Sequence, residues 1–152
     1  MGTPVLDAQP AYFAGAEFSP DGRAIAYLSD ETGRDEVYVR PYGRPGDAVP
    51  VSTDGGNEPR WSPDGKEVFF RHGDAFVAAT VSASVDRLTV GDAKKLFEVR
   101  AAVGRSTFTP GYSVSADGKR FLVHLLDPRA IPTRILVVEN WFEELSAKVP
   151  PR

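Results

Sequence analysis

The side chains that could do chemistry in this sequence are few and scattered. Its two histidines, His72 and His124, are too few for a histidine metal cluster, and it contains no cysteine. The run 111–115 (Gly-Tyr-Ser-Val-Ser) approaches the Gly-x-Ser-x-Gly pattern of a serine nucleophile but fails at its last position. We therefore expect no catalytic residue, no metal ligands and no bound cofactor, and a protein that is not an enzyme.

Carboxylates and glycines gather at two places where a binding site could be argued. A calcium loop of the EF-hand type needs carboxylates at alternating positions, which the stretch 30–36 does not supply. The glycine-rich segment 54–57 lacks the strand-to-helix context and the Lys-Ser/Thr pair of a phosphate loop. A crossing between two structural units explains these glycines better.

Three of the aspartates belong to a tetrapeptide that occurs three times. Ser-Pro-Asp-Gly at 19–22 returns at 62–65 and, as Ser-Ala-Asp-Gly, at 115–118. Proline fixes φ, aspartate bonds back to nearby backbone, and glycine takes positive φ without steric cost. Each copy should close a β-hairpin. The residues to which we assign this structural turn role are Asp21, Gly22, Asp64, Gly65, Asp117 and Gly118.

The flanks of the turns repeat as well. Phe18, Trp61 or Val114 precedes the serine, and two runs of β-forming residues follow each turn. The turns begin at positions 19, 62 and 115, roughly the 40- to 50-residue spacing of propeller blades. We expect an all-β fold of three four-stranded blades, with an unrelated β-sandwich as the alternative. The predicted blades cover about 16–53, about 58–99 and about 111–138.

Several stretches resemble the TolB-like propeller repeat, a WD40-like repeat of the PD40 type. Residues 58–66 followed by an apolar strand look like the repeat itself, and residues 33–42 fit the same group. The ending, 137–150, is similar to the C-terminus of TolB-like propeller domains attached to bacterial serine/threonine kinases. The resemblance implies a six-bladed propeller, of which this chain would be the C-terminal half. The sequence carries no kinase motif.

Composition and charge narrow the function classes. The chain has 152 residues, in the range of one domain, and a net charge of −3 from 18 basic and 21 acidic residues. This balance disfavours nucleic-acid and anionic-membrane partners. No apolar stretch approaches the roughly 20 residues of a membrane span, and the first residues lack the apolar core of a signal peptide. The compartment stays unknown, although the resembling group is often extracytoplasmic.

The two ends of the chain predict how the blades are completed. Blade three has no fourth strand of its own, whereas residues 3–7 form a strand without a blade. A loose leader is the alternative for that segment. A short helix is expected over about 140–148, with Asn140 as its N-cap and Glu143 three residues on.

Three blades fall short of the about four to eight found in closed propellers. An open wedge would leave two large apolar faces in water, which soluble monomers avoid. We therefore expect a homodimer, in which two copies sit head to tail and each N-terminal strand joins the last blade of the partner. A trimer and an out-of-context fragment are the alternatives. The residues expected in the strand exchange are Val5, Leu6, Ile135 and Val137.

The function expected from these features is binding without catalysis. Inner strands of a propeller line its central channel, and here they carry the candidate channel-lining residues Glu17, Glu58 and Arg60. We interpret the chain as a non-enzymatic scaffold or binding module for protein or peptide ligands that self-associates into a closed six-bladed ring. The alternative is a fragment of a propeller domain of a larger bacterial protein, kinase- or peptidase-associated, without independent activity.

Overall fold

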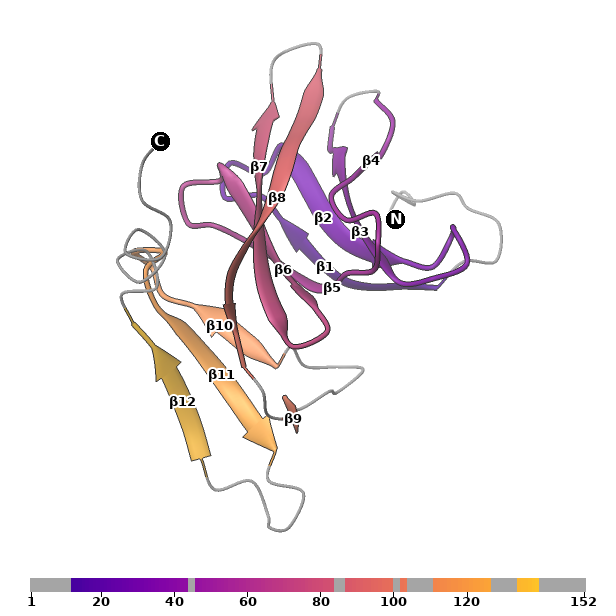
Figure 1. Ribbon diagram of the computed structural model, residues 1–152. Helices are drawn as coiled ribbons and strands as arrows, with labels where there is room; N and C mark the ends of the chain where they lie inside the picture. The colour runs from indigo at the N-terminus through magenta and orange to yellow at the C-terminus, as the bar shows by residue number, and fades with distance from the viewer. Residues whose placement is uncertain are drawn as a thin grey trace, which may run out of the picture.

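The computed structural model describes residues 12–43, 46–83, 87–99, 102–103, 111–126 and 134–139. Within these ranges the chain is all β, with no helix, and its strands form three four-stranded antiparallel sheets. The expected N-terminal strand, with Val5 and Leu6, and the expected C-terminal helix lie outside the described residues. Figure 1 shows the sheets following one another in chain order, with the second between the first and the third.

Each sheet is built from strands that are neighbours in the sequence. The first has the order β1 (Phe13–Phe18), β2 (Ala24–Ser29), β3 (Glu36–Pro41) and β4 (Val49–Pro50). The second has the order β5 (Asn57–Trp61), β6 (Glu67–His72), β7 (Ala75–Ala83) and β8 (Leu88–Glu98). The third has β10 (Tyr112–Val114), β11 (Phe121–Leu126) and β12 (Arg134–Val138), and β9 (Ala102–Val103) also pairs with β11.

Two strands differ from the sequence expectation. Strand β8 begins at Leu88 rather than near Leu96. Strand β7 runs on to Ala83, so β8 pairs with it from Leu88 onward, as Val90 does with Val81. Strand β9 lies in a stretch expected to be only a connection. Val103 of β9 pairs with Leu125 of β11, and the other side of Leu125 pairs with β12. Strand β9 therefore lies on the same side of β11 as β10. The other edge of β12 has no neighbour among the described strands.

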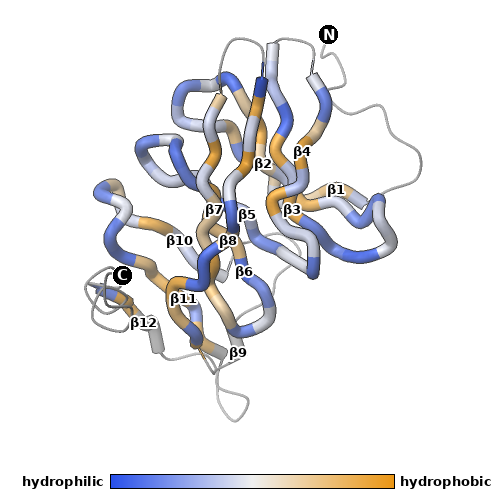
Figure 2. The backbone as a smooth tube through the Cα atoms, turned by 45° about the horizontal axis from the view of Figure 1, so that its top comes forward, coloured by the Kyte–Doolittle hydropathy of each residue, from blue (hydrophilic) through white to orange (hydrophobic). Residues whose placement is uncertain are grey.

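The core lies between the sheets because the central strands are apolar on both faces. Successive side chains of a strand point to opposite faces. Val68 and Phe70 of β6 therefore pack toward the first sheet, in a cluster with Ala26 and Val39. Phe69 packs toward the third sheet, where its ring centroid lies 5.1 Å from that of Phe121. Figure 2 shows hydrophobic residues concentrated on these strands and polar residues on the turns.

The repeated tetrapeptide forms the same hydrogen-bonded turn at each hairpin. In the first copy the Ser19 hydroxyl donates to Asp21 Oδ1 at 2.7 Å and accepts the Ala24 N–H at 2.9 Å. Asp21 Oδ1 also accepts the Arg23 N–H at 3.0 Å, and Gly22 has φ +71°. The turns at 62–65 and 115–118 repeat these bonds. The serine hydroxyl, followed by backbone N–H groups, lowers the pKa of all three aspartates.

The outward face of the first sheet is only partly exposed. Ile25, Tyr27 and Tyr38 are buried there and form a cluster with Phe13 and Ala48. The two tyrosine rings stack with centroids 5.8 Å apart. Burial, followed by the charge of a nearby glutamate, raises the pKa of Tyr27 to about 12. The apolar side chains at the centre of this face are therefore buried within the chain, whereas Phe18 and Tyr42 at one end of it are exposed.

Candidate functional site

The candidate channel-lining residues lie on β1 and β5, the first strands of the first two sheets. Each strand pairs irregularly with its neighbour, between Ala14 and Glu17 in β1 and between Asn57 and Arg60 in β5. Gly15, with φ +60°, lies within the first irregularity, and the corresponding residue of the second, Glu58, has φ +54°. These kinks aim the following side chains across the junctions between the sheets.

Glu17 and Arg60 are brought together at the junction of the first two sheets. Arg60 Nη1 lies 3.6 Å from Glu17 Oε1, and both side chains are partly exposed. The second carboxylate oxygen of Glu17 accepts the backbone N–H of Trp61 at 3.0 Å. The indole N–H of Trp61 donates to the Glu17 carbonyl at 3.2 Å. Glu17 therefore holds the second sheet against the first, and the Glu17–Arg60 pair stays partly exposed.

Glu58 is directed away from this pair, into the junction of the second and third sheets. Its Oε1 lies 3.5 Å from Arg71 Nη1, and its Oε2 accepts the Gly111 N–H at 3.1 Å. Its carbonyl accepts the Tyr112 hydroxyl at 2.9 Å. A left-handed conformation costs a residue with a side chain roughly 1 to 2 kcal/mol. The bonds of Glu58 to Arg71, Gly111 and Tyr112 offset the cost of its left-handed conformation.

Sequence reasoning missed two members of this second junction, Arg71 and Tyr112. Arg71 is buried, donates through Nη2 to the Gly73 carbonyl at 2.9 Å, and places its guanidinium carbon 5.7 Å from the centroid of the Phe76 ring. Its Nε is buried without a hydrogen-bond partner. Burial, followed by the charge of Glu58, raises the pKa of Tyr112 well above its usual value. A charged residue at the end of an otherwise apolar run was the signal for Arg71.

The crossing from the first to the second sheet is fastened by the buried carboxylate of Glu36. One oxygen accepts Arg34 Nε at 2.7 Å and the Gly55 N–H at 2.9 Å, and the other accepts the hydroxyl of Ser52. The Ser52 hydroxyl in turn accepts the Val37 N–H at 2.9 Å. The glycine-rich segment is thus part of a closed hydrogen-bond network.

Among the described residues no group of three or more His, Asp or Glu could hold a metal ion.

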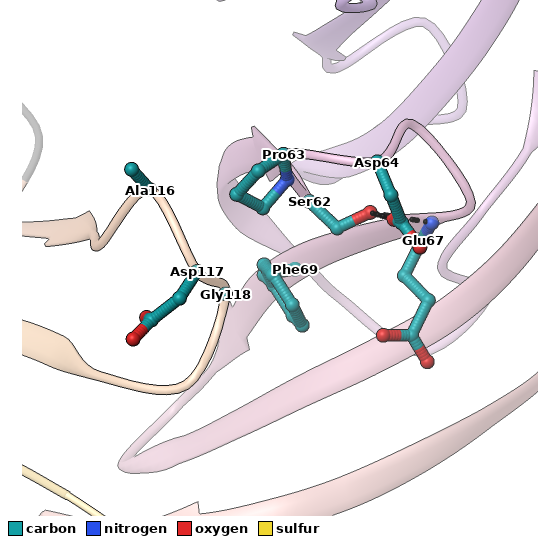
Figure 3. Close-up of a pocket in the computed structure, with 8 residues that line it drawn as sticks. All are labelled: Ser62, Pro63, Asp64, Glu67, Phe69, Ala116, Asp117 and Gly118. Atoms are coloured by element: carbon teal, nitrogen blue, oxygen red, sulfur yellow. Dashed lines mark hydrogen bonds between the residues drawn. The ribbon is translucent and has the colours of Figure 1, made fainter.

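A groove of about 370 Å³ lies between the β5–β6 turn and the β10–β11 turn. Figure 3 shows Phe69 between the two turns, with the carboxylate of Glu67 at the side of the second sheet. Burial, followed by the charge of Asp64, raises the pKa of Glu67. The Ser62 hydroxyl is engaged with Asp64, so it is no free nucleophile. The lining residues are Ser62, Pro63, Asp64, Glu67, Phe69, Ala116, Asp117 and Gly118.

A wider hollow of about 590 Å³ lies on the first sheet, beside the Glu36 network. Its lining combines Tyr38 and Pro50 with the polar turn 31–34. The two histidines lie on different sheets, His72 on β6 and His124 on β11. The lining of each of the two hollows combines polar and aromatic side chains. No helix in the described part of the chain could cross a membrane.

Comparisons with known proteins bear on the fold. No protein-family model matches the chain, and no curated protein is significantly similar to it in sequence. TolB from Acinetobacter baumannii matches with a TM-score of 0.55 and 21% identity, over 83% of this chain and 29% of that chain. A protein from Agrobacterium tumefaciens assigned as TolB matches with a TM-score of 0.60 and 18% identity, over 90% of this chain and 48% of that chain.

The chain has the fold of part of a TolB-like β-propeller. The prediction of an all-β fold related to this repeat is therefore confirmed. The chain spans less than half the length of either TolB structure. A protein from Bacteroides uniformis assigned as a 6-phosphogluconolactonase matches with a TM-score of 0.48 and 17% identity, over 85% of this chain and 40% of that chain.

Proposed function

We propose that this chain is a non-enzymatic binding or scaffold module that self-associates into a closed ring of six TolB-like blades. The observation that carries the proposal is that the described residues form three such sheets in sequence and that apolar side chains on the outward face of the third are exposed. Leu122 is 36% exposed and Val137 is 51% exposed there, and the two are cross-strand partners on β11 and β12. Apolar pairs of this kind in a sheet are normally covered by a neighbouring layer.

The edge of β12 that has no neighbour among the described strands supports the second part of the proposal. Unpaired backbone N–H and C=O groups at a sheet edge attract another strand. An exchanged N-terminal strand carrying Val5 and Leu6, lying along Ile135 and Val137, would pair that edge by strand addition. In such a ring, Glu17 and Arg60 would present a pair of opposite charges at the mouth of the channel. A protein or peptide ligand with exposed polar and aromatic groups fits that surface.

The mass of the assembly in solution tests the proposal. Sedimentation velocity at micromolar concentration is expected to give a single species of twice 16.5 kDa. Val137→Arg places a charge on the uncovered face and should shift the species toward the monomer. Lys119→Arg, at the exposed turn of the same sheet, is the matched control that keeps the charge already present. A wild-type chain that sediments only at 16.5 kDa contradicts self-association.

One observation favours a second candidate. The chain corresponds to 29% and 48% of the two TolB structures, so it also fits a portion of a larger propeller domain. In that case the covering sheets come from elsewhere in a longer protein and the chain has no activity of its own. A purely monomeric, aggregation-prone chain that regains solubility when further blades are added to it would support this candidate over the ring.

A further inference from the structure

Phe18 and Tyr42 form an exposed aromatic pair at one end of the first sheet. Phe18 is 53% exposed and Tyr42 is 43% exposed. Their ring centroids lie 4.9 Å apart, edge to face at 80°. On the same outward face Ile25, Tyr27 and Tyr38 are buried, and Phe13 and Ala48 are partly buried against them. The pair thus places two exposed aromatic rings in contact beside the Ser-Pro-Asp-Gly turn of the first sheet.

The second sheet shows what these two positions are used for. Trp61 occupies the position of Phe18, immediately before the serine of the repeated turn. Val81 occupies the position of Tyr42: the Tyr42 N–H donates to the Arg23 carbonyl at 2.8 Å, and the Val81 N–H donates to the corresponding Lys66 carbonyl at 2.7 Å. Trp61 and Val81 are each only 7% exposed, in the cluster between the first and second sheets. A preceding sheet buries both positions.

The repeated turns contact one another in the same order. A side chain added at Gly65 would meet Cδ of Pro20 at 3.4 Å, so the first turn lies against the second. A side chain added at Gly118 would likewise meet Cδ of Pro63 at 3.4 Å. At Gly22 no atom lies within 4 Å. Ala116 stands in the third turn where the earlier turns have proline, and it is exposed. We call the glycine side of a turn its receiving side and the side of the Pro or Ala its presenting side. Among the described residues, the receiving side of the 19–22 turn and the presenting side of the 115–118 turn have no such contact.

We infer that the β10–β11 turn of a second copy of this chain docks on the Phe18–Tyr42 pair, with Ala116 of that copy against Gly22. This inference rests on the proposed self-association and names its contact. The contact continues a pattern that the chain already repeats twice between its own sheets. It joins the first sheet of one copy to the third sheet of the other, so it is head to tail, and two such contacts close a twofold ring.

Cross-linking between engineered cysteines tests the orientation, and the chain has no native cysteine to interfere. Arg23→Cys marks the receiving turn and Ala116→Cys marks the presenting turn; both positions are exposed. A short bifunctional maleimide is expected to link the two variants when they are mixed and to leave each variant alone unlinked. A dimeric protein in which Arg23→Cys links only to itself would overturn the inference and leave self-association standing. An unlinked mixture of monomers would remove both.

Affinity gives a second readout with a matched control. Tyr42→Ala removes half of the docking pair and is expected to raise the dissociation constant of the dimer at least about tenfold, as at an interface hot spot. Tyr12→Ala removes another exposed tyrosine outside the pair and should leave that constant unchanged. Circular dichroism shows whether each variant keeps its β content. Equal constants for the two folded variants would overturn the docking site.

Discussion

Trp61 and Glu17 are joined by two hydrogen bonds that cross from the second sheet to the first. The Glu17 carboxylate accepts the Trp61 backbone N–H at 3.0 Å, and the indole N–H of Trp61 donates to the Glu17 carbonyl at 3.2 Å. One residue of β1 thus acts as acceptor twice for one residue of β5. The corresponding residues, Phe18 and Val114, have no indole N–H, so among the three sheets only the second can make this double contact to a preceding strand.

The contribution of the indole bond can be measured with Trp61→Phe. The variant keeps an aromatic ring but removes the donor and some volume, so we expect the free energy of unfolding to fall by about 1 to 2 kcal/mol. Trp61→Ala should cost about 3 to 5 kcal/mol, since it also leaves a cavity where the indole ring was packed. Urea denaturation followed by circular dichroism provides both values. A Phe variant as stable as the wild type would show that the indole bond contributes nothing net.

Glu58 offers a test in which glycine is the better substitute. Glu58→Ala removes the carboxylate from the buried Arg71, with an expected loss of about 3 kcal/mol. Glu58→Gly removes the same carboxylate but relieves the φ of +54°, so it should be about 1 kcal/mol more stable than the alanine variant. Denaturant titrations of the two variants under identical conditions give the comparison. At ordinary strand positions the order is reversed, so an alanine variant that is the more stable would refute this account.

The three turn aspartates predict part of the acid limb of stability. Their pKa values lie below the usual 3.8, first because of the serine hydroxyls and then because of backbone N–H groups. A carboxyl group whose folded pKa is depressed contributes stability that is fully present above its unfolded pKa and is lost as the pH falls through the folded value. The triple variant Asp21→Asn, Asp64→Asn, Asp117→Asn should therefore show a shallower fall in Tm below about pH 4.

Thermal denaturation from about pH 6 to about pH 2 measures this difference. Asp92→Asn, an exposed aspartate of β8 outside the turns, serves as the control and should follow the wild-type curve. If the triple variant loses Tm in acid in parallel with the wild type, the serine–aspartate bonds do not carry the predicted linkage.

Glu67 predicts a dependence of the opposite sign. Burial, followed by the charge of Asp64, raises its pKa above the usual 4.5, so ionisation on going to neutral pH disfavours the folded state. Glu67→Gln should be more stable than the wild type at neutral pH, and the advantage should vanish below about pH 4.5. The backbone bond from the residue 67 N–H to the Ser62 hydroxyl, 2.9 Å, does not depend on the side chain. Chemical denaturation at the two pH values decides, and a less stable Gln variant at neutral pH would contradict the assignment.

Local chemistry was enough to predict the hairpins, because Asp-Gly turns and apolar runs act within a few residues of the chain. The two-faced apolar pattern of β6, with Phe69 and Phe70 facing opposite neighbours, also predicted a layer on either side. This is why the all-β propeller fold could be predicted without coordinates. The short strand β9 was missed because two residues carry no periodicity of their own.

The junction residues needed information that is not local. The residues next to Glu58 in the sequence form no pattern that indicates its role. Its carboxylate nevertheless accepts the N–H of Gly111, 53 residues further along the chain. A comparison of the repeats does single it out, since Gly15 and Gly111 stand at the corresponding positions. The sequence placed Phe18 and Trp61 at one position of the repeat, but their very different exposure depends on which sheet precedes each. The roles of Glu17, Glu58 and Arg60 in a channel stay predictions.

Each Ser-x-Asp-Gly turn makes its closing bonds within six consecutive residues and borrows none of them from a neighbouring sheet. A stretch of gene encoding one blade therefore carries its own means of closing the hairpin wherever it is inserted. Tandem copying could lengthen the array without further adjustment at the turns, and later divergence would be confined to the contacts at the seams. The third turn, where alanine replaces the proline of the other two, is where such divergence is visible.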